Sequence, residues 1–250
     1  PACAQIAADV FRSFVKGEIL LTDSKTAEMT KLIENTYRDL NIALANELVL
    51  LCHRLGINPL KAIELANKHP RVNILNPGPG VGGHCLAVDP YFIIEKAPEL
   101  ARLISRARIV NNEMPEYVYN AVKRLLTGLN HPKIAVLGLS YKGNVGDLRE
   151  SPALKIVTLL REAGYALSLY EPHADSPDVE NDIYMVVKDA DMILILTDHD
   201  EFKSLDYNKL ASHMRTSLLF DTRNILPTSD FTDSKLKLIN LGNLFEHCAL

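Results

Sequence analysis

The most reactive type of side chain in this protein, a cysteine thiol, lies at the end of a glycine-rich segment. The segment reads Asn76-Pro-Gly-Pro-Gly-Val-Gly-Gly-His-Cys85 and holds four glycines in ten residues. Each glycine costs conformational entropy on folding, so a segment that served burial alone would gain little from so many. The pattern therefore indicates a backbone that comes close to a ligand, with the thiol of Cys85 at the end of the approach.

Three roles are open to this thiol. A lone cysteine is most often buried and unreactive. A metal ligand would need partners, and we expect no metal site because no CxxC pair occurs among Cys3, Cys52, Cys85 and Cys248. A nucleophile would need positive charge or backbone N–H groups nearby, which the glycines and a helix start after Asp89 could supply. His84 is not assigned as its partner, because neighbours in an extended loop usually point apart.

A second group of polar residues precedes this loop. Lys31, Asn35 and Arg38 stand at positions i, i+4 and i+7, which puts them on one face of a helix. Such a trio is usually a solvated stripe, so the spacing alone does not define a site. His69 and Arg71 lie just before the loop, where they could meet phosphate or sugar or simply face water.

A third group of polar residues follows the ends of predicted strands and consists of Tyr141, Lys142, Arg149 and Arg223. A strand, a glycine-bearing turn and a helix form a phosphate-binding layout. The GxGxxG fingerprint is absent, because four residues separate Gly138 from Gly143, so the signal for a nucleotide is weak. The alternative for Arg223 is a position in a surface turn.

The first half of the chain is expected to be mostly helical. Apolar residues recur at steps of three and four over 26–55, which predicts one long helix. Further helices are expected over 59–67 and 90–126, the last interrupted near Pro98 and again near Pro115.

The second half alternates short apolar runs with helical segments. Strands are expected at 133–139, 166–170, 192–196, 217–221 and 236–241, and a helix at 152–163. This alternation indicates an α/β fold, with an all-helical domain followed by a Rossmann-like, doubly wound parallel-sheet domain. Ligands of such sheets bind at the carboxyl ends of the strands. The boundary is expected in the turn-rich stretch 127–132.

Composition excludes several classes of protein. The 250 residues suffice for one large or two ordinary domains, and 47% hydrophobic with 23% charged residues is typical of a soluble protein. The net charge of -4 gives no reason to expect nucleic acid or a membrane surface as a partner. No apolar run approaches the roughly 20 residues of a membrane span. No signal peptide is visible and cysteines are few, so we expect a cytoplasmic protein.

Four segments together resemble the UDP-glucose/GDP-mannose dehydrogenase family in order and spacing. They read TAEMTKLIENTYRDLNIALANE, HPRVNILNPGPGVGGHCLAVDP, GLSYKGNVGDLRES and FDTRN. The resemblance covers nearly the whole chain, and the GGHC loop with its helix is the most specific part. The second segment is most similar to the branch of the family that acts on UDP-N-acetyl-D-mannosamine, since the UDP-glucose branch tends to carry GGSC.

The resemblance also implies how the chain is divided. Residues 1–22 would be the tail of an N-terminal NAD-binding domain, 23–127 the central helical dimerisation and catalytic domain, and 128–250 the C-terminal UDP-sugar-binding domain. The sequence is therefore interpreted as a fragment, with the site for the cofactor NAD mainly on the absent domain.

The activity that the resemblance implies is oxidation of the sugar C6 alcohol to a carboxylate, with two NAD+ consumed. Cys85 would add to the aldehyde as a thiohemiacetal and then hold a thioester that water hydrolyses. Lys31 would stabilise the oxyanion or exchange protons, and Asn35 with Asp89 would position the water.

The resemblance assigns further residues to ligands. Those that would bind the UDP-sugar are Arg38, His69, Gly82, Tyr141, Lys142 and Arg223. Arg71 would reach the site of a partner subunit, since the family dimerises through its central helices, and Arg149 would contact NAD.

Three functions follow as expectations. The first is a UDP-N-acetylmannosamine 6-dehydrogenase that serves surface polysaccharide synthesis. The second keeps this chemistry with UDP-N-acetylglucosamine or UDP-glucose as substrate. The third is a non-catalytic module that binds a UDP-sugar and dimerises.

Overall fold

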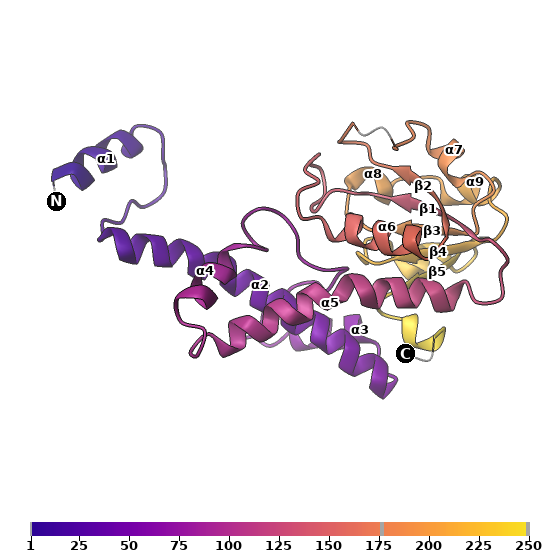
Figure 1. The fold of residues 1–250 in the computed structure, drawn as a ribbon, viewed down its shortest axis with the longest axis horizontal. Helices are drawn as coiled ribbons and strands as arrows, with labels where there is room; N and C mark the ends of the chain where they lie inside the picture. Colours follow the sequence, from indigo (N-terminus) through magenta and orange to yellow (C-terminus); the bar gives the residue numbers. More distant parts are fainter. Residues whose placement is uncertain (1, 176–177, 249–250) are drawn as a thin grey trace.

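The computed structural model describes residues 2–175 and 178–248, in which an elongated helical part leads into a compact α/β part (Figure 1). The helical part contains α1 (Ala2–Arg12), α2 (Ser24–Leu55), α3 (Pro59–Ala66), α4 (Asp89–Lys96) and α5 (Arg102–Leu125). Helix α1 lies apart from the rest at the far end of α2 (Figure 1). None of the described helices combines the length and the apolar character that crossing a membrane requires.

The ends of the long helix α2 follow from local chemistry. At its N-terminus the Asp23 carboxylate accepts hydrogen bonds from the backbone N–H and the hydroxyl of Thr26, as an N-cap does. At its C-terminus Gly56 adopts the left-handed conformation, with φ of 68°, which glycine reaches without steric cost. Asn58 then caps α3, with Pro59 in the first turn, so the predicted helix pair is confirmed.

Helix α5 continues through Pro115, so the expected interruption there is wrong. Proline removes one helical hydrogen bond to the carbonyl four residues earlier, here that of Asn111. The neighbouring Met114 and Val118 are fully buried, and their packing holds the helix together across this missing bond. The expected break near Pro98 is present, because α4 ends at Lys96 and α5 begins at Arg102.

The α/β part is built on a five-stranded parallel sheet in the order β2-β1-β3-β4-β5. The strands are β1 (Lys133–Leu137), β2 (Ala166–Tyr170), β3 (Met192–Ile195), β4 (Leu218–Asp221) and β5 (Lys237–Asn240). The chain moves outward in one direction from β1 to β2 and in the other from β3 to β5, so the α/β, doubly wound fold is confirmed. The strand order reverses between β1 and β3, and at such a point the ends of the strands leave a crevice for ligands.

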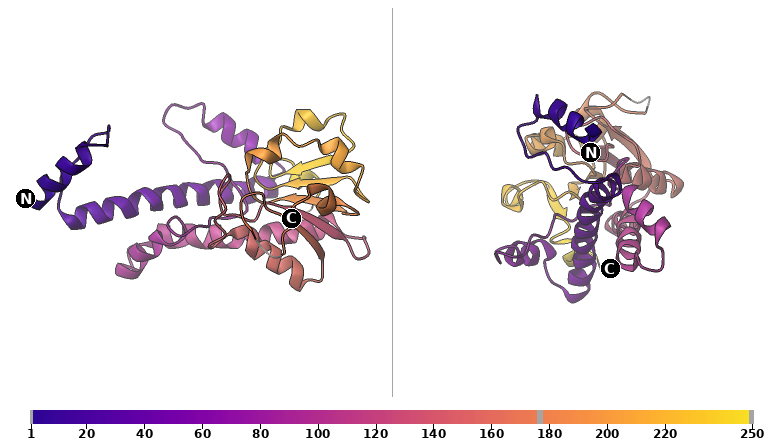
Figure 2. Two further views of the ribbon diagram at one scale, coloured as in Figure 1. Left: turned by 90° about the horizontal axis from the view of Figure 1, so that it is seen from above. Right: turned by 90° about the vertical axis from the view of Figure 1, so that its left-hand side faces the viewer.

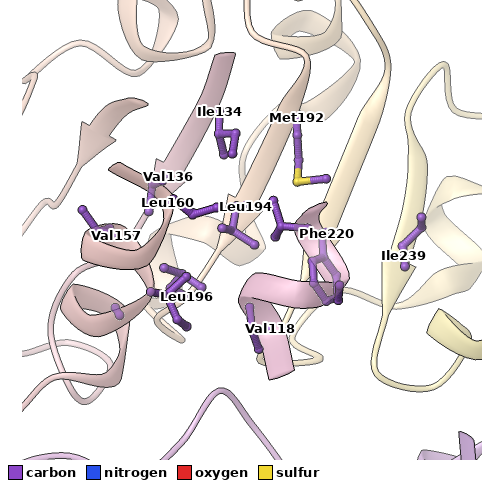
Figure 3. Packing of buried hydrophobic residues seen from close by; sticks show 14 of the residues in the cluster. Val118, Ile134, Val136, Val157, Leu160, Met192, Leu194, Leu196, Phe220 and Ile239 are labelled. Carbon is purple, nitrogen blue, oxygen red and sulfur yellow. The ribbon is translucent and has the colours of Figure 1, made fainter. Parts of the chain in front are cut away.

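Helices cover both faces of this sheet. Alternate strand residues pack beneath α5 and α6 (Pro152–Glu162), where Val118 and Leu160 meet Val136 and Leu194 (Figure 3). The other face is covered by α7 (Ile183–Val187), α8 (Asp200–Lys203) and α9 (Tyr207–Ala211). Short 3-10 helices lie at Thr228–Phe231 and Leu244–Glu246.

Helix α5 joins the two parts. Its first half packs along α2, as Figure 2 shows from above, and its last turns lie in the core of the sheet. Helix α5 therefore contributes buried residues to both the helical part and the α/β part. The predicted domain boundary between residues 127 and 128 stays a prediction.

Candidate active site

The glycine-rich loop is held against α2 by two buried asparagines. Asn41 accepts a hydrogen bond from the backbone N–H of Leu75 (2.9 Å). Asn46 accepts one from the N–H of Gly78 (2.9 Å) and donates to the side chain of Asn111 on α5 (3.0 Å). Buried polar groups need such partners, so these bonds fix where the loop backbone lies relative to the helix.

A buried ion pair fixes the spacing of α2 and α5 nearby. Nη1 of Arg108 lies 2.5 Å from the Asp39 carboxylate, and the two side chains are 4% and 1% exposed. Asn111 donates to the same carboxylate (2.8 Å). Burial raises the pKa of the Asp39 carboxyl, and the charge of Arg108 opposes that rise. The loop is therefore supported by two helices whose relative position is specified by polar contacts.

A cleft of about 380 Å³ lies between α2, the glycine-rich loop and the turn after β1. It brings together most of the residues singled out from the sequence, namely Asn35, Arg38, Gly82, Cys85, Tyr141, Lys142 and Arg223. They come from four distant parts of the chain. The helix trio and the loop thus face one another in part, a relation that spacing along the chain could not establish.

The carboxamide of Asn35 is joined directly to Asp89, the first residue of α4. Nδ2 of Asn35 lies 2.6 Å from Oδ2 of Asp89, and Asn35 is buried. A carboxylate in the first turn of a helix interacts favourably with the helix dipole, so the dipole and Asn35 both favour this position of Asp89. The pair therefore forms one rigid wall beside the cleft.

The loop glycines are required by the protein's own backbone. A Cβ on Gly82 would lie 2.4 Å from the carbonyl oxygen of Glu150 and 2.7 Å from Pro152. Gly83 has φ of 88°, and a Cβ there would meet the ring of Tyr141 at 2.7 Å. The sequence predicted that these glycines let the backbone approach a ligand, and that stays a prediction. The close approach that the structure shows is of the loop against the turn that carries Tyr141 and Glu150.

The thiol of Cys85 lies at the rim of this cleft and contacts its neighbour. Its Sγ lies 2.9 Å from Nδ1 of His84, so the expectation that the two side chains point apart is wrong. The loop is not extended here: the Cys85 carbonyl accepts the N–H groups of Val88 (3.0 Å) and Asp89 (2.8 Å). In such a turn consecutive side chains can converge, which the glycine-rich sequence did not reveal.

A residue that sequence reasoning missed, Asp198, lies on the opposite wall. Its carboxylate is 3.0 Å from Nη2 of Arg223 and accepts the N–H of Gly143 (3.2 Å). Burial alone would raise the pKa of the Asp198 carboxyl, but the charge of Arg223 lowers it overall. Asp198 follows β3 at the switch point of the sheet, and that topological rule is the signal that could have found it.

The turn after β1 uses two of its backbone N–H groups for hydrogen bonds within the protein. The N–H groups of Leu139 (2.7 Å) and Ser140 (3.0 Å) both donate to the carboxylate of Glu171, which follows β2. These are the groups that would cradle a dinucleotide pyrophosphate in this kind of fold. The described residues of this domain therefore do not fit NAD at that turn.

Five of the predicted site residues do not line the cleft. One is Asp89, described above, and the other four are Lys31, His69, Arg71 and Arg149. Lys31 is 66% exposed and its ammonium contacts Glu34 (3.3 Å), one turn before Asn35. His69 and Arg71 are exposed on the approach to the loop, with the Arg71 N–H donating to Nδ1 of His69 (3.3 Å). The fourth residue, Arg149, is exposed beside the rim.

The Arg149 guanidinium forms an ion pair with Asp147, with Nη2 and Oδ2 2.6 Å apart. Its hydrogen bonds lower the pKa of the Asp147 carboxyl to about 2, and the charge of His84 acts in the same direction. Asp147 therefore remains an anion close to the histidine that contacts Cys85.

A cluster of His173, His199 and Glu201 has the composition of a metal site. Its buried member is already satisfied, because Nδ1 of His199 accepts the N–H of Asn144 (2.9 Å). Nε2 then carries the proton and lies 3.2 Å from the Glu171 carboxylate. His199 therefore acts as a structural bridge that closes the turn after β1.

Two family models match this chain. The central domain of the UDP-glucose/GDP-mannose dehydrogenase family matches residues 25–113, and the UDP binding domain of the same family matches residues 135–228. The chain therefore belongs to the UDP-glucose/GDP-mannose dehydrogenase family, which makes its class that of the sugar-nucleotide dehydrogenases.

Two relatives and one solved structure show which members of the family this chain is similar to. The chain is 48% identical over 246 residues to the UDP-N-acetyl-D-mannosamine dehydrogenase of Methanococcus vannielii, covering 96% of this chain and 57% of that protein. It is 46% identical to the NDP-N-acetyl-D-galactosaminuronic acid dehydrogenase of Ralstonia solanacearum, covering 90% and 54%. A solved UDP-N-acetyl-mannosamine dehydrogenase from S. aureus matches with a TM-score of 0.89 and 49% identity, covering 99% and 58%. The chain thus spans little more than half the length of these relatives.

Proposed function

We propose that the protein containing this chain oxidises the C6 alcohol of UDP-N-acetyl-D-mannosamine to the carboxylate, in the cytoplasm and for surface polysaccharide synthesis. The observation that carries this proposal is the position of Cys85, a thiol at the rim of a cleft that also holds Asn35 and several cations. The membership of the family and the similarity to UDP-N-acetyl-D-mannosamine dehydrogenases support it.

In this proposal Cys85 retains the sugar between two oxidations. Its thiolate adds to the C6 aldehyde, forming a carbon–sulfur bond and an oxyanion that takes up a proton as a thiohemiacetal. Oxidation of that adduct leaves a thioester, which water hydrolyses to the carboxylate and the free thiol. Asn35 and Asp89 would orient this water, since their side chains form a fixed pair beside the cleft.

The basic side chains of the cleft suit a nucleotide diphosphate. Lys142, Arg223 and Arg38 line it, whereas Asp198 is its one carboxylate among the described lining residues. Cations with fixed positions bind phosphate oxygens through charge-assisted hydrogen bonds. We assign Tyr141, Lys142 and Arg223 to the UDP moiety and Arg38 with the Gly82 backbone to the sugar.

NAD would accept the two hydrides, as the established cofactor of the dehydrogenase family. Its main site is proposed to lie outside these 250 residues, because Glu171 occupies the turn after β1 that could otherwise cradle its phosphates. Arg149 is proposed to contact it from the rim, where its side chain is 67% exposed. Lys31, likewise exposed, is proposed to stabilise the oxyanion once that side of the cleft is covered.

We also propose a homodimer through α2. Large apolar side chains form one exposed row on this helix, on the face opposite the buried polar residues: Ile33, Tyr37, Leu44, Leu51 and Leu55. A contiguous exposed apolar surface of this kind marks a protein–protein contact. In such a dimer the exposed Arg71 would reach the partner's cleft, and His69 would bind substrate beside it.

The test of the activity uses the full-length protein. Supplied with UDP-N-acetyl-D-mannosamine and NAD+, it should produce two NADH for each sugar oxidised, measured by absorbance against product quantified by mass spectrometry. Cys85→Ser should lower kcat by at least about 10³-fold, because a nucleophile is lost. Unchanged turnover in this variant, or no turnover with any UDP-sugar, would refute the proposal.

A second substrate class is favoured by one comparison, the 46% identity to an NDP-N-acetyl-D-galactosaminuronic acid dehydrogenase. The chemistry would be the same, and only the sugar would differ. The alternatives UDP-N-acetylglucosamine and UDP-glucose belong to the same test. Comparing kcat/KM for UDP-N-acetyl-D-mannosamine, UDP-N-acetyl-D-galactosamine, UDP-N-acetylglucosamine and UDP-glucose decides among them, since discrimination lies in that ratio.

The remaining candidate is a non-catalytic module that binds a UDP-sugar and dimerises. The Glu171 carboxylate occupies the turn after β1, which favours this non-catalytic role for the 250 residues taken alone. Calorimetry of these residues with UDP-sugar and with NAD+ distinguishes a non-catalytic module from a chain that holds a complete dehydrogenase site. Tight NAD+ binding and NADH production by this chain alone would contradict our placement of the cofactor.

A further inference from the structure

We propose that His84 forms a thiolate–imidazolium pair with Cys85 and thereby sets the reactivity of the nucleophile. This inference rests on the proposed function of Cys85. It assigns a role to His84, which the proposed function does not itself require. Its basis is the contact of 2.9 Å between Sγ of Cys85 and Nδ1 of His84, in a turn whose backbone is held in place.

The proton balance of the pair is simple. The thiol proton moves from Sγ to Nδ1, which leaves a thiolate and an imidazolium with no other reactant. A thiolate is the nucleophilic form of cysteine, and an adjacent imidazolium is a known way to favour it at neutral pH. The two atoms are already in contact at 2.9 Å, so the proton transfer needs no rearrangement of the side chains.

The turn 141–151 supplies charges of both signs to this pair. Asp147 is close enough to His84 for their charges to interact, and its anionic carboxylate favours the imidazolium form. Arg149 is close enough to Cys85 for its guanidinium to favour the thiolate form. Asp147 and Arg149 are ion-paired to each other at 2.6 Å, which fixes the position of the anion relative to the cation.

The other charged groups of the cleft are mostly cations. Arg38 adds positive charge from α2, and Lys142 adds it from the turn after β1, next to Tyr141. Asp198 and Arg223 form an ion pair and together add no net charge, whereas Asp89 on α4, bonded to Asn35, carries a carboxylate that opposes the thiolate. Arg38 and Lys142 outweigh Asp89, so the net charge around Cys85 is positive and favours the thiolate.

The backbone explains why the adjacent residues can meet. The N–H of Gly83 donates to the carbonyl of Arg149 (3.2 Å), which fastens the loop to the turn directly before His84. The Cys85 carbonyl is bonded to the N–H groups of Val88 and Asp89 on the other side. Both ends of the pair are thus restrained, so the imidazole holds the thiol in a fixed position.

The test is the pH dependence of Cys85 alkylation, which needs neither NAD nor a UDP-sugar. The chain carries a second exposed thiol, Cys3, so the measurement uses a Cys3→Ser background and assigns the label by peptide mass spectrometry. With iodoacetamide, the rate for an ordinary thiol of pKa about 8.5 falls tenfold for each pH unit below that value. Cys85 with His84 present should instead keep a flat rate down to about pH 6.

His84→Ser is the informative variant, with His131→Asn as the control. At pH 6 the alkylation rate of Cys85 should fall at least about tenfold in His84→Ser, after allowing for the lower intrinsic nucleophilicity of a low-pKa thiolate. His131 lies in an exposed turn after α5, so His131→Asn should leave the profile unchanged. His84→Gln provides a second variant should the serine variant unfold, with folding checked by circular dichroism.

The pH profile separates this role from a merely structural one, because a loss of packing would not move its inflection. Superimposable profiles in wild type and both His84 variants, with inflections near pH 8.5, would overturn the proposal. A profile that depends on His84 in a protein without dehydrogenase activity would leave the pair intact and overturn only the proposed function.

Discussion

At the scale of single residues, the glycine-rich loop shows how one absent Cβ decides a contact. Gly82 and Gly83 lie against the turn that carries Tyr141 and Glu150, at distances that leave no room for a side chain. The same turn carries the ion pair of Asp147 and Arg149 beside Cys85. The shape of the cleft therefore depends on residues that contribute no functional group of their own.

Gly82→Ala should destabilise the protein. The new Cβ would lie 2.4 Å from the Glu150 carbonyl oxygen, which belongs to backbone and cannot rotate away. Overpacking of this kind costs about 1–3 kcal/mol, so the midpoint of thermal unfolding should fall measurably. Gly17→Ala is the matched control, because its nearest neighbour would be 4.0 Å away. Equal melting temperatures for the two variants would contradict this reading of the loop.

At the scale of elements, α2 is a helix with two opposite faces. One face carries buried polar residues that bond to the loop, to α4 and to α5, among them Asn35, Asp39 and Asn46. The opposite face carries the row of exposed apolar residues. The helix therefore supports the cleft on one side and exposes an apolar surface on the other.

Near its end, α2 is tied to the C-terminal segment through a buried histidine. Nε2 of His53 lies 2.6 Å from the Leu241 carbonyl, so it must donate, and Nδ1 then accepts the hydroxyl of Tyr117 on α5. Burial lowers the pKa of His53, while the bond to Leu241 opposes that shift. The folded protein therefore binds this proton less readily than the unfolded chain.

Stability should consequently fall as the pH drops. Above the unfolded pKa of about 6.5 the neutral His53 contributes fully, and below it the unfolded state takes up a proton that the folded state resists. The free energy of unfolding should decrease by about 1.4 kcal/mol for each unit of pH across that window. Urea unfolding at pH 7.5 and 5.5 measures this. His53→Gln should show a smaller pH dependence than wild type, and an unchanged dependence would assign the effect to other histidines.

At the scale of the whole molecule, two parts share α5 and enclose the cleft between them. The helical part supplies Asn35 and Cys85, and the α/β part supplies Lys142, Asp198 and Arg223 at the switch point of its sheet. A second cleft of about 390 Å³ lies beside it between α3 and the end of β4, and Arg223 lines both. Any movement of one part against the other would thus alter the binding surface.

The proposed dimer provides a test at this scale. Leu44 and Leu51 lie in the middle of the apolar row on α2, with exposures of 46% and 52%. Leu44→Glu combined with Leu51→Glu should convert the protein to a monomer in sedimentation velocity, because two buried charges per chain would oppose association. Met185→Glu is the control, since Met185 is equally exposed (53%) but lies on α7. A wild-type protein that sediments as a monomer at micromolar concentration would contradict the proposal.

Much of the architecture could be predicted from local patterns. The periodicity of α2, the capping at Asp23 and Gly56 and the alternation of strands and helices all arise between near neighbours in the chain. The expectation for Pro115 was wrong because tertiary packing of Met114 and Val118 outweighed a local helix-breaking signal.

The sequence by itself determined which chemistry is available: a thiol beside glycines, a polar helix face and charges at strand ends. Only the tertiary structure decided which groups meet. It joined Asn35 to Asp89, placed Asp198 on Arg223, turned His84 toward Cys85 and filled the turn after β1 with Glu171. The physical reason is that helices and strands are specified by residues a few positions apart, whereas a site is specified by the packing of segments distant in the chain.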